Sequence, residues 1–347
     1  MNSPAGADSW PRRRGLLRAL LGICILAATT AGALAAEPEA PLRLGLPVDC
    51  RLGEDCFVQQ MPDIDPGEEA LDPLCGRATY QDHDGWDIRL RSLKDIARPV
   101  PVIVIADGTV ARTRDGVPDR IYDRVRDGDL KGRECGNGVV VEHARGLVSQ
   151  YCHLKEGSVA VKPGTHVGKG ATLGSIGSSG LAEFPHVHLS VRRDGQRIEP
   201  LTGRPLGVAG QSCGDTTRSP FEPSVREALI RSTSAILSIG LTNAPPQSSS
   251  LVRSGDPPVP TTSEPVIAWV WAINVEAGSV FRLRLVDPAR KTILNFETRP
   301  LEGRKADYVA YVAGKRGLSE GAYGLQVDLV SDGKAVGSMA RSIFIGR

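Results

Sequence analysis

All six histidines of the 347-residue chain lie in one window, from His83 to His188. Two of them, His186 and His188, are separated by one apolar residue in a strand-like run, so both side chains project from the same face of a strand. At about 3.3 Å per residue they lie about 6.6 Å apart. That spacing suits one histidine that binds a metal and a second that reaches a water on that metal. An isolated H-x-H also occurs on the polar face of a half-buried strand, so the rest of the chain must decide.

A second candidate pair, His83 and Asp87, brackets the turn signal Asp84-Gly85. Asp87 opens a strand-like alternation, so the imidazole and the carboxylate can converge on one point. A catalytic zinc needs three protein ligands and an open position for a water, whose pKa it lowers toward about 7. His83, Asp87 and one of His186 and His188 supply such a set. Alone, the same H-x-x-x-D pattern is more typical of a solvated turn.

Several β elements must position these side chains. The segments Gly138–His143 and Leu147–Leu154 predict a hairpin that places His153 at the far end of its returning strand. Val102–Ala106 and Thr109–Arg112 predict two strands joined by a tight turn. Glycines separate short apolar pairs between Val159 and Gly180, which is typical of a compact β-barrel or sandwich.

The polar insertion 114–134 contains five aspartates, but their spacing does not match an EF-hand loop. We therefore expect a solvated loop rather than a calcium site. Because it is long for a loop, it can border a substrate groove.

Three ordered motifs over residues 80–195 resemble the lysostaphin-type (LytM-like) zinc endopeptidases, which cut the peptides of bacterial peptidoglycan. The H-x-G-x-D motif matches residues 83–87, Y-x-H-L matches residues 151–154, and the glycine-rich approach to H-x-H matches residues 174–188. The resemblance implies an antiparallel sheet of hybrid barrel-like form. Family members often continue the H-x-H with aromatic and acidic residues, where this chain has Leu189 and Ser190.

The resemblance also assigns roles to five residues. It implies that His83, Asp87 and His188 bind one Zn²⁺ per chain, and that His186 and His153 flank the bound water and the developing oxyanion. We therefore expect a zinc endopeptidase that hydrolyses peptide cross-links of peptidoglycan and acts as a monomer on wall peptides. The alternative is a non-enzymatic regulator of cell-wall hydrolases on the same scaffold. A metal store would leave His153 and His186 without a purpose.

The first residues have the pattern of an export signal. Arg12-Arg13-Arg14 precede an apolar run that ends in an A-x-A sequence at residues 33–35. We interpret residues 1–35 as a cleaved signal peptide and expect a periplasmic or extracellular protein without a stable membrane span. A membrane anchor fits less well, because the uncharged part after Arg18 is short and rich in Ala, Thr and Gly.

Without residues 1–35, which carry four arginines and one aspartate, the formal charge changes from +2 to −1. The chain then has no Lys/Arg cluster with interleaved aromatic residues. This composition argues against nucleic-acid binding.

Six cysteines follow the predicted signal, an even number that indicates three disulfides in an exported protein. Six cysteines allow 15 pairings, and the sequence alone does not choose among them. Short separation favours Cys50–Cys56 and a hairpin favours Cys135–Cys152, which leaves Cys75 with Cys213. Zinc bound by cysteines would need close C-x-x-C pairs, and these are absent.

The organisation predicted is mainly β. Residues 36–78 form a disulfide-tied extension without a core of its own, and residues 79–222 form the peptidase domain. A helix is expected in residues 223–244, a Pro/Ser/Thr-rich linker in 245–265, and an all-β immunoglobulin-like sandwich in 266–347. The sandwich contains no histidine or cysteine, so its role is left open between wall binding, a protein partner and neither.

Overall fold

A computed structural model describes residues 42–231 and 233–347, and the predicted signal peptide lies outside them. The described part is mainly β, which confirms the predicted fold class. None of the described helices is long and apolar enough to cross a membrane.

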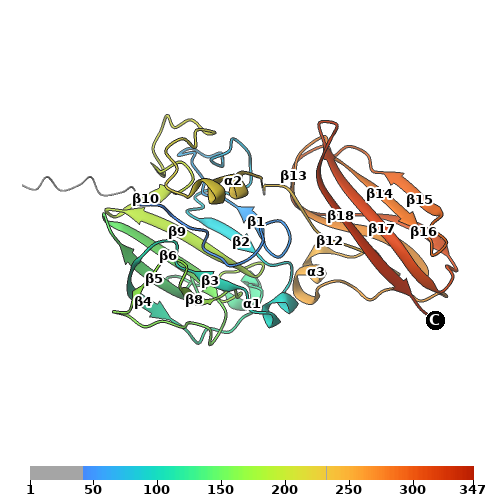
Figure 1. The fold of residues 1–347 in the computed structure, drawn as a ribbon, viewed down its shortest axis with the longest axis horizontal. Helices are drawn as coiled ribbons and strands as arrows, with labels where there is room; N and C mark the ends of the chain where they lie inside the picture. The colour runs from blue at the N-terminus through green and yellow to red at the C-terminus, as the bar shows by residue number, and fades with distance from the viewer. Residues whose placement is uncertain (1–41, 232) are drawn as a thin grey trace, which may run out of the picture. The chain divides into compact units, whose positions relative to one another are not determined.

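A nine-stranded sheet carries the motif residues (Figure 1). Seven of its strands follow one another in the order β1-β2-β9-β6-β5-β4-β7, while β10 pairs with β9 and β11 pairs with β10. Their bounds are β1 (Phe57–Gln60), β2 (Trp86–Arg89), β4 (Gly108–Arg114), β5 (Asn137–His143), β6 (Leu147–Leu154), β7 (His166–Val167), β9 (His186–Arg193), β10 (Gln196–Glu199) and β11 (Arg204–Pro205). Strand β9 therefore lies between the strands that carry the other two motifs.

The register of these antiparallel strands brings the motifs together. Asp87 of β2 lies directly opposite His188 of β9, and Cys152 of β6 lies opposite the same histidine. Alternate residues of β9, namely Val187, Leu189 and Val191, are buried in the core of this domain. Alternation then sends the histidines to the other face of the sheet.

The predicted hairpin of residues 138–154 is confirmed, since β5 and β6 pair along their length. The two strands predicted around a tight turn in residues 102–112 are present as β3 (Pro101–Ile103) and β4, but they do not pair with each other. Strand β3 pairs with β8 (Thr172–Ser175) in a separate two-stranded sheet, while β4 joins the main sheet. Val102–Ala106 is a short apolar run, whereas Thr109–Arg112 mixes exposed and buried residues. Neither pattern specifies which strand is the partner. The insertion 114–134 holds one short helix, α1 (Arg124–Asp127).

The amino-terminal extension is built into the domain. Strand β1 pairs with β2, and Leu44, Val48, Val58 and Met61 lie in the same hydrophobic core as β9. Another short element, the 3-10 helix η1 (Leu93–Ala97), follows β2. All three predicted disulfides are confirmed: Cys50–Cys56, Cys75–Cys213 and Cys135–Cys152. The extension thus shares the core of the domain instead of only wrapping it.

The helix predicted for residues 223–244 is half wrong. Helix α2 (Pro223–Arg231) is present, but Ala235–Thr242 forms strand β12, whose eight residues are all buried. A short continuous apolar run fits a buried strand as well as a helix, so its neighbours decide. The predicted linker 245–265 contains helix α3 (Ser248–Ser254).

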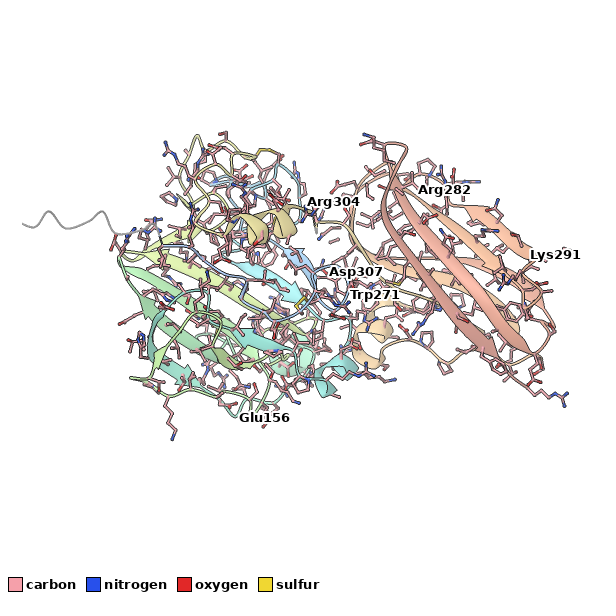
Figure 2. All side chains as sticks on the ribbon, in the orientation of Figure 1. Glu156, Trp271, Arg282, Lys291, Arg304 and Asp307 are labelled. Carbon is pink, nitrogen blue, oxygen red and sulfur yellow. A yellow bond between two sulfur atoms is a disulfide. The ribbon has the colours of Figure 1, made fainter. Side chains whose placement is uncertain are left out.

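The carboxy-terminal part consists of two antiparallel sheets, shown from orange to red in Figure 1. One has the order β12-β13-β16 and the other β15-β14-β17-β18. The added bounds are β13 (Pro265–Val275), β14 (Val280–Val286), β15 (Thr292–Glu297), β16 (Lys305–Arg316), β17 (Gly321–Ser331) and β18 (Lys334–Ile345). A shared hydrophobic cluster joins both sheets, and Trp271 of β13 donates a hydrogen bond to Asp307 of β16 at 3.0 Å (Figure 2). Because β12 is a strand of the first of these sheets, the carboxy-terminal part begins at Ala235 and not at the predicted residue 266.

Candidate metal centre

Three donor groups converge on one point above strand β9. His83 Nε2 lies 3.3 Å from His188 Nδ1 and 3.2 Å from Asp87 Oδ2, and His188 Nδ1 lies 2.8 Å from Asp87 Oδ1. Tetrahedral zinc with ligand bonds of about 2.0–2.1 Å separates its donor atoms by about 3.3 Å. These three residues form the group of the described chain that can hold a metal ion.

Hydrogen bonds at the far side of each ring fix which nitrogen faces the centre. His83 Nδ1 donates to the carbonyl oxygen of Met61 at 2.8 Å, and His188 Nε2 donates to Asp84 Oδ1 at 3.2 Å. In the neutral rings the other nitrogens then carry lone pairs. This is the outer support that oriented metal-binding histidines usually have.

The charge of the donor set also fits a cation. His83 Nε2, His188 Nδ1 and the Asp87 carboxylate meet at one point, an arrangement that a cation stabilises and that a proton on His188 stabilises in part. Burial would raise the pKa of Asp87, but the neighbouring His83, His186 and His188 hold that pKa well below its ordinary value. Burial would lower the pKa of His188, but hydrogen bonds to Asp84 and Asp87 raise it to about 9.

Gly85 explains the glycine of the first motif. A Cβ at this position would lie 2.4 Å from His188 Nε2 and 2.7 Å from the carbonyl oxygen of Leu189. Any side chain here would displace the His188 ring or the β9 backbone. The glycine is therefore required for the close approach of the β2 turn to strand β9.

Two further histidines flank the donor set. His186 Nδ1 donates to the carbonyl of Phe184 and His153 Nδ1 donates to the carbonyl of Ser179, each at 2.8 Å. Their ring centres lie 4.5 Å apart, and His186 Nε2 is 3.6 Å from Asp87 Oδ1. Burial lowers the pKa of both rings, so both are neutral at pH 7 with the lone pair on Nε2.

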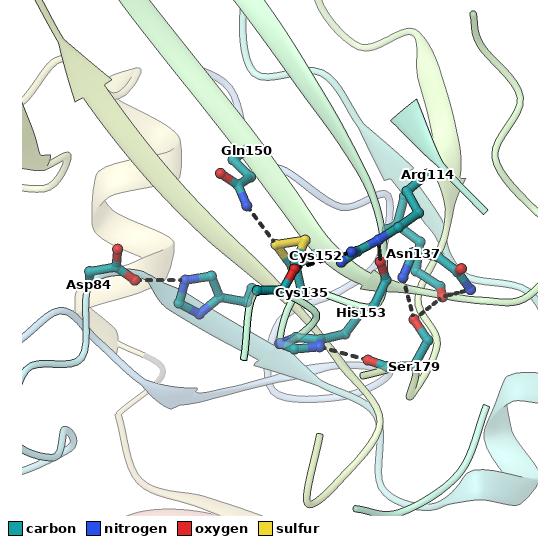
Figure 3. The surroundings of a disulfide bond; sticks show 12 residues. Asp84, Arg114, Cys135, Asn137, Gln150, Cys152, His153 and Ser179 are labelled. Carbon is teal, nitrogen blue, oxygen red and sulfur yellow. Dashed lines mark hydrogen bonds and ion pairs between the residues drawn. A yellow bond between two sulfur atoms is a disulfide. The ribbon is translucent and has the colours of Figure 1, made fainter. Parts of the chain in front are cut away.

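A disulfide holds the backbone at His153 (Figure 3). Cys152 is bonded to Cys135, and the Cys135 carbonyl accepts a hydrogen bond from the His153 amide at 2.8 Å. His153 adopts a left-handed backbone conformation with φ 60°. Ser179, whose carbonyl orients the ring, also binds the Asn137 amide through its hydroxyl at 2.9 Å. The disulfide and these hydrogen bonds therefore fix the end of β6 and hold the His153 side chain toward the groove.

The opposite face of β2 is anchored by a buried carboxylate. Trp86 Nε1 donates to Glu199 Oε1 at 3.0 Å, and Glu199 also accepts from the backbone amides of Leu201 and Thr202. Burial raises the pKa of Glu199. Since Trp86 precedes Asp87, this network fixes the strand that carries the carboxylate ligand candidate.

A groove of about 740 Å³ runs over the donor set. Asp87, His153, His186 and His188 lie in its lining, and the ring of Tyr80 on the rim lies 4.5 Å from that of His83. The centre is thus accessible to a ligand the size of a short peptide.

Residues 81–200 match the family model described as Peptidase family M23. This stretch is an M23 domain. It spans all three motifs and ends one residue after the buried Glu199. The resemblance of the motifs to LytM-like peptidases is therefore confirmed.

Two curated proteins are similar to part of this chain. An uncharacterized metalloprotease of Haemophilus influenzae is 29% identical over 158 residues, covering 45% of this chain and 27% of that protein. The DD-carboxypeptidase/endopeptidase Mpg of Neisseria meningitidis is 31% identical over 118 residues, covering 33% of this chain and 23% of Mpg. This chain therefore spans only about a quarter of the length of these relatives.

Among solved structures, the mutant catalytic domain of the prophage-encoded M23 protein EnpA from Enterococcus faecalis is similar to this chain. It is 20% identical with a TM-score of 0.29, and the match covers 45% of this chain and 92% of that one.

The structure brings together all five site residues expected from the sequence. Sequence reasoning missed the groups that orient them, notably the Met61 carbonyl, Asp84 and Glu199. Met61 lies in the extension, and no pattern in the sequence links it to His83. Asp84 stands inside the first motif, where it was interpreted only as part of a turn signal.

Proposed function

We propose that this chain is an exported zinc-dependent endopeptidase that hydrolyses peptide cross-links of bacterial peptidoglycan. The observation that carries the proposal is the convergence of His83, Asp87 and His188 in an open groove beside two neutral histidines. The M23 match and the similarity to a protein named DD-carboxypeptidase/endopeptidase support the same reaction class. Three disulfides in a chain with an export-like start support an oxidising compartment.

Residues His83, Asp87 and His188 would hold the metal. When bound, zinc supplies Lewis-acid polarisation and lowers the pKa of a water toward about 7. His83 contributes Nε2 and His188 contributes Nδ1, because Met61 and Asp84 engage the other nitrogens. These hydrogen bonds support the ligand assignment proposed from the sequence.

His186 is the proposed general base. Its Nδ1 hydrogen is engaged by Phe184, so its Nε2 lone pair is free to accept the proton of the attacking water. The Arg89 guanidinium lies 4.5 Å from the centre of the Phe184 ring, whose centre is 4.6 Å from that of His186. This packing keeps His186 beside Asp87. Once protonated, His186 can give the proton to the leaving amine.

His153 needs a refinement of its expected role. Ser179 selects the tautomer in which Nε2 carries a lone pair, so neutral His153 accepts and does not donate a hydrogen bond there. It can stabilise an oxyanion only after taking up a proton. We therefore propose that His153 is a second proton carrier beside His186, which becomes a donor to the oxyanion in its protonated form.

Digestion of purified peptidoglycan tests the proposal. The zinc-loaded protein is expected to release fragments whose mass spectra identify the bond that is cut, and both a chelator and His188→Ala are expected to abolish release. Zinc-loaded protein that releases nothing from varied cross-linked walls would contradict an enzymatic role. Wall binding that is unchanged by chelator and by His188→Ala would instead favour the non-enzymatic alternative.

A further inference from the structure

Strand β9 carries more than the two histidines on its groove face. Alternation places His186, His188, Ser190 and Arg192 on the same side of the sheet, and all four line the groove. Arg192 pairs directly with Arg197 of β10, which lines the groove as well. Two guanidinium groups therefore stand side by side at one end of the groove.

Adjacent like charges directly opposite each other on paired strands destabilise a sheet unless an anion lies between them. Asp84 supplies that anion: its Oδ2 lies 3.1 Å from Arg197 Nε and 3.9 Å from Arg192 Nη2. The other oxygen of Asp84 accepts from His188 Nε2. The Asp84 carboxylate thus contacts two guanidinium groups and an imidazole. Its single negative charge leaves an excess of positive charge at the end of the groove that Arg192 and Arg197 line.

Both arginines are accessible to a ligand. Their side chains are 31% and 53% exposed, and Arg192 Nη1 also donates a hydrogen bond to Gln150 Oε1 at 3.4 Å. Ser190, between His188 and Arg192 on the same face, is small and uncharged. Asp84 lies 3.9 Å from Arg192 Nη2 and Gln150 accepts from Nη1, so a guanidinium with five N–H donors keeps donors for an incoming anion.

The other side of the donor set has the opposite charge. Glu183 precedes His186 by three residues, and Glu134 lies nearby because its carbonyl accepts a hydrogen bond from the Leu181 amide. Both glutamates line the groove, and within the described chain its lysine and arginine lining consists of the two arginines at the other end. The groove is therefore polarised along β9, acidic before the histidines and basic after them.

We propose that Arg192 and Arg197 bind a free carboxylate of the peptide substrate within about two residues of the scissile bond. The proposal rests on the proposed peptidase function. It specifies the class of peptide that the same groove would bind, namely peptides with a free carboxylate near the scissile bond. Only the Asp84 carboxylate and the His188 ring separate the guanidinium groups from the proposed metal-binding nitrogen. A planar carboxylate held there by two guanidinium groups would fix the register of the peptide over the centre.

Wall peptides offer two sources of such a carboxylate. One is the terminal carboxylate of an uncross-linked stem peptide. The other is the carboxylate of a diamino acid whose side-chain amine forms the cross-link. Both present the same chemistry to the arginines, so the experiment must contain one substrate pair for each source.

The test compares kcat/KM for each peptide with its carboxamide analogue, once for a linear stem peptide and once for a cross-linked dimer. We expect the wild type to prefer the carboxylate by about 10- to 100-fold in at least one pair, mainly through KM. Arg192→Gln and Arg197→Gln should each reduce that ratio toward one, and Arg192→Lys should restore part of it. The pair that shows the preference identifies the source.

Arg193→Gln is the matched control, because Arg193 is the next residue on β9 and alternation places it on the other face. Its carboxylate preference should equal that of the wild type. Equal cleavage of carboxylate and carboxamide by the wild type, unchanged in Arg192→Gln, would overturn the proposal while leaving the peptidase function intact. If no peptide is cleaved, the peptidase function fails. The carboxylate proposal is then decided by binding: the His186→Ala protein should bind each carboxylate peptide more tightly than its carboxamide analogue, and equal Kd values would overturn the proposal.

Discussion

His188 donates a hydrogen bond from Nε2 to Asp84 at 3.2 Å, while its Nδ1 faces His83 and Asp87. Asp84 therefore selects the tautomer of a proposed metal ligand. It also lies within 3.9 Å of both groove arginines. One carboxylate thus links the proposed metal centre to the proposed carboxylate site.

Asp84→Asn should weaken zinc binding by about 10- to 100-fold, because the amide is a poorer acceptor and no longer raises the basicity of His188. Competition with a fluorescent zinc chelator measures the affinity. Asp82→Asn is the control: it removes a nearby exposed carboxylate and keeps a side chain that tolerates the local φ of 62°. Equal affinity of the two variants would contradict the orienting role of Asp84.

Replacing the two histidines of β9 should separate metal binding from proton transfer. His188→Ala should lose both zinc and activity, because it removes a proposed ligand. His186→Ala should keep most of its zinc while kcat falls by about 10²- to 10⁴-fold, the usual contribution of a general base. Metal analysis of the purified proteins, alongside wall digestion, checks both expectations. Loss of zinc from His186→Ala would reverse the assignment.

Gly85→Ala should disturb the centre although alanine is small, because the new Cβ would lie 2.4 Å from His188 Nε2. We expect a loss of about 1–3 kcal/mol in stability and weaker zinc binding. Denaturant unfolding and zinc titration measure the two effects. Gly303→Ala is the control, since a Cβ at that position meets no atom within 4 Å. A Gly85→Ala protein that resembles this control would disprove the steric explanation.

The double variant Cys135→Ser with Cys152→Ser should lower kcat more than it lowers zinc content. The disulfide joins the residue before His153 to the segment whose carbonyl binds the His153 amide. Its loss should also reduce stability by about 3 kcal/mol in the chain-entropy model. The Cys50→Ser with Cys56→Ser variant is the comparison, because neither residue lines the groove. Equal kcat for the two double variants would argue against the positioning role.

Glu199→Gln should have an effect on stability that depends on pH. Burial raises the pKa of Glu199, so the folded state binds its proton more tightly than the unfolded state. Its favourable contribution is present below the ordinary pKa of 4.5 and is lost as pH rises through the higher folded value. The wild type should therefore lose stability relative to Glu199→Gln as the pH rises from below 4.5 toward neutral pH. Denaturant midpoints of both proteins across this range measure the difference, and parallel curves would contradict it.

The sequence by itself identified the residues of the candidate site. The motifs at residues 83–87, 151–154 and 186–188 named five residues whose side chains the fold brings together. Period-two alternation of β9 was sufficient to place both of its histidines on one face. The cysteine count and local spacing also led to the three disulfides that the structure contains. These features depend on residue type and short-range geometry, which a sequence displays directly.

Only the tertiary structure decided which groups support those side chains and which strands pair. Met61 reaches His83 across 22 residues, and Glu199 reaches Trp86 across 113. The separation of β3 from β4, and the strand at Ala235–Thr242, also depended on partners far along the chain. A short apolar run buries equally well as a helix or as a strand in any sheet. Its neighbours in space, and not its own pattern, select among these structures.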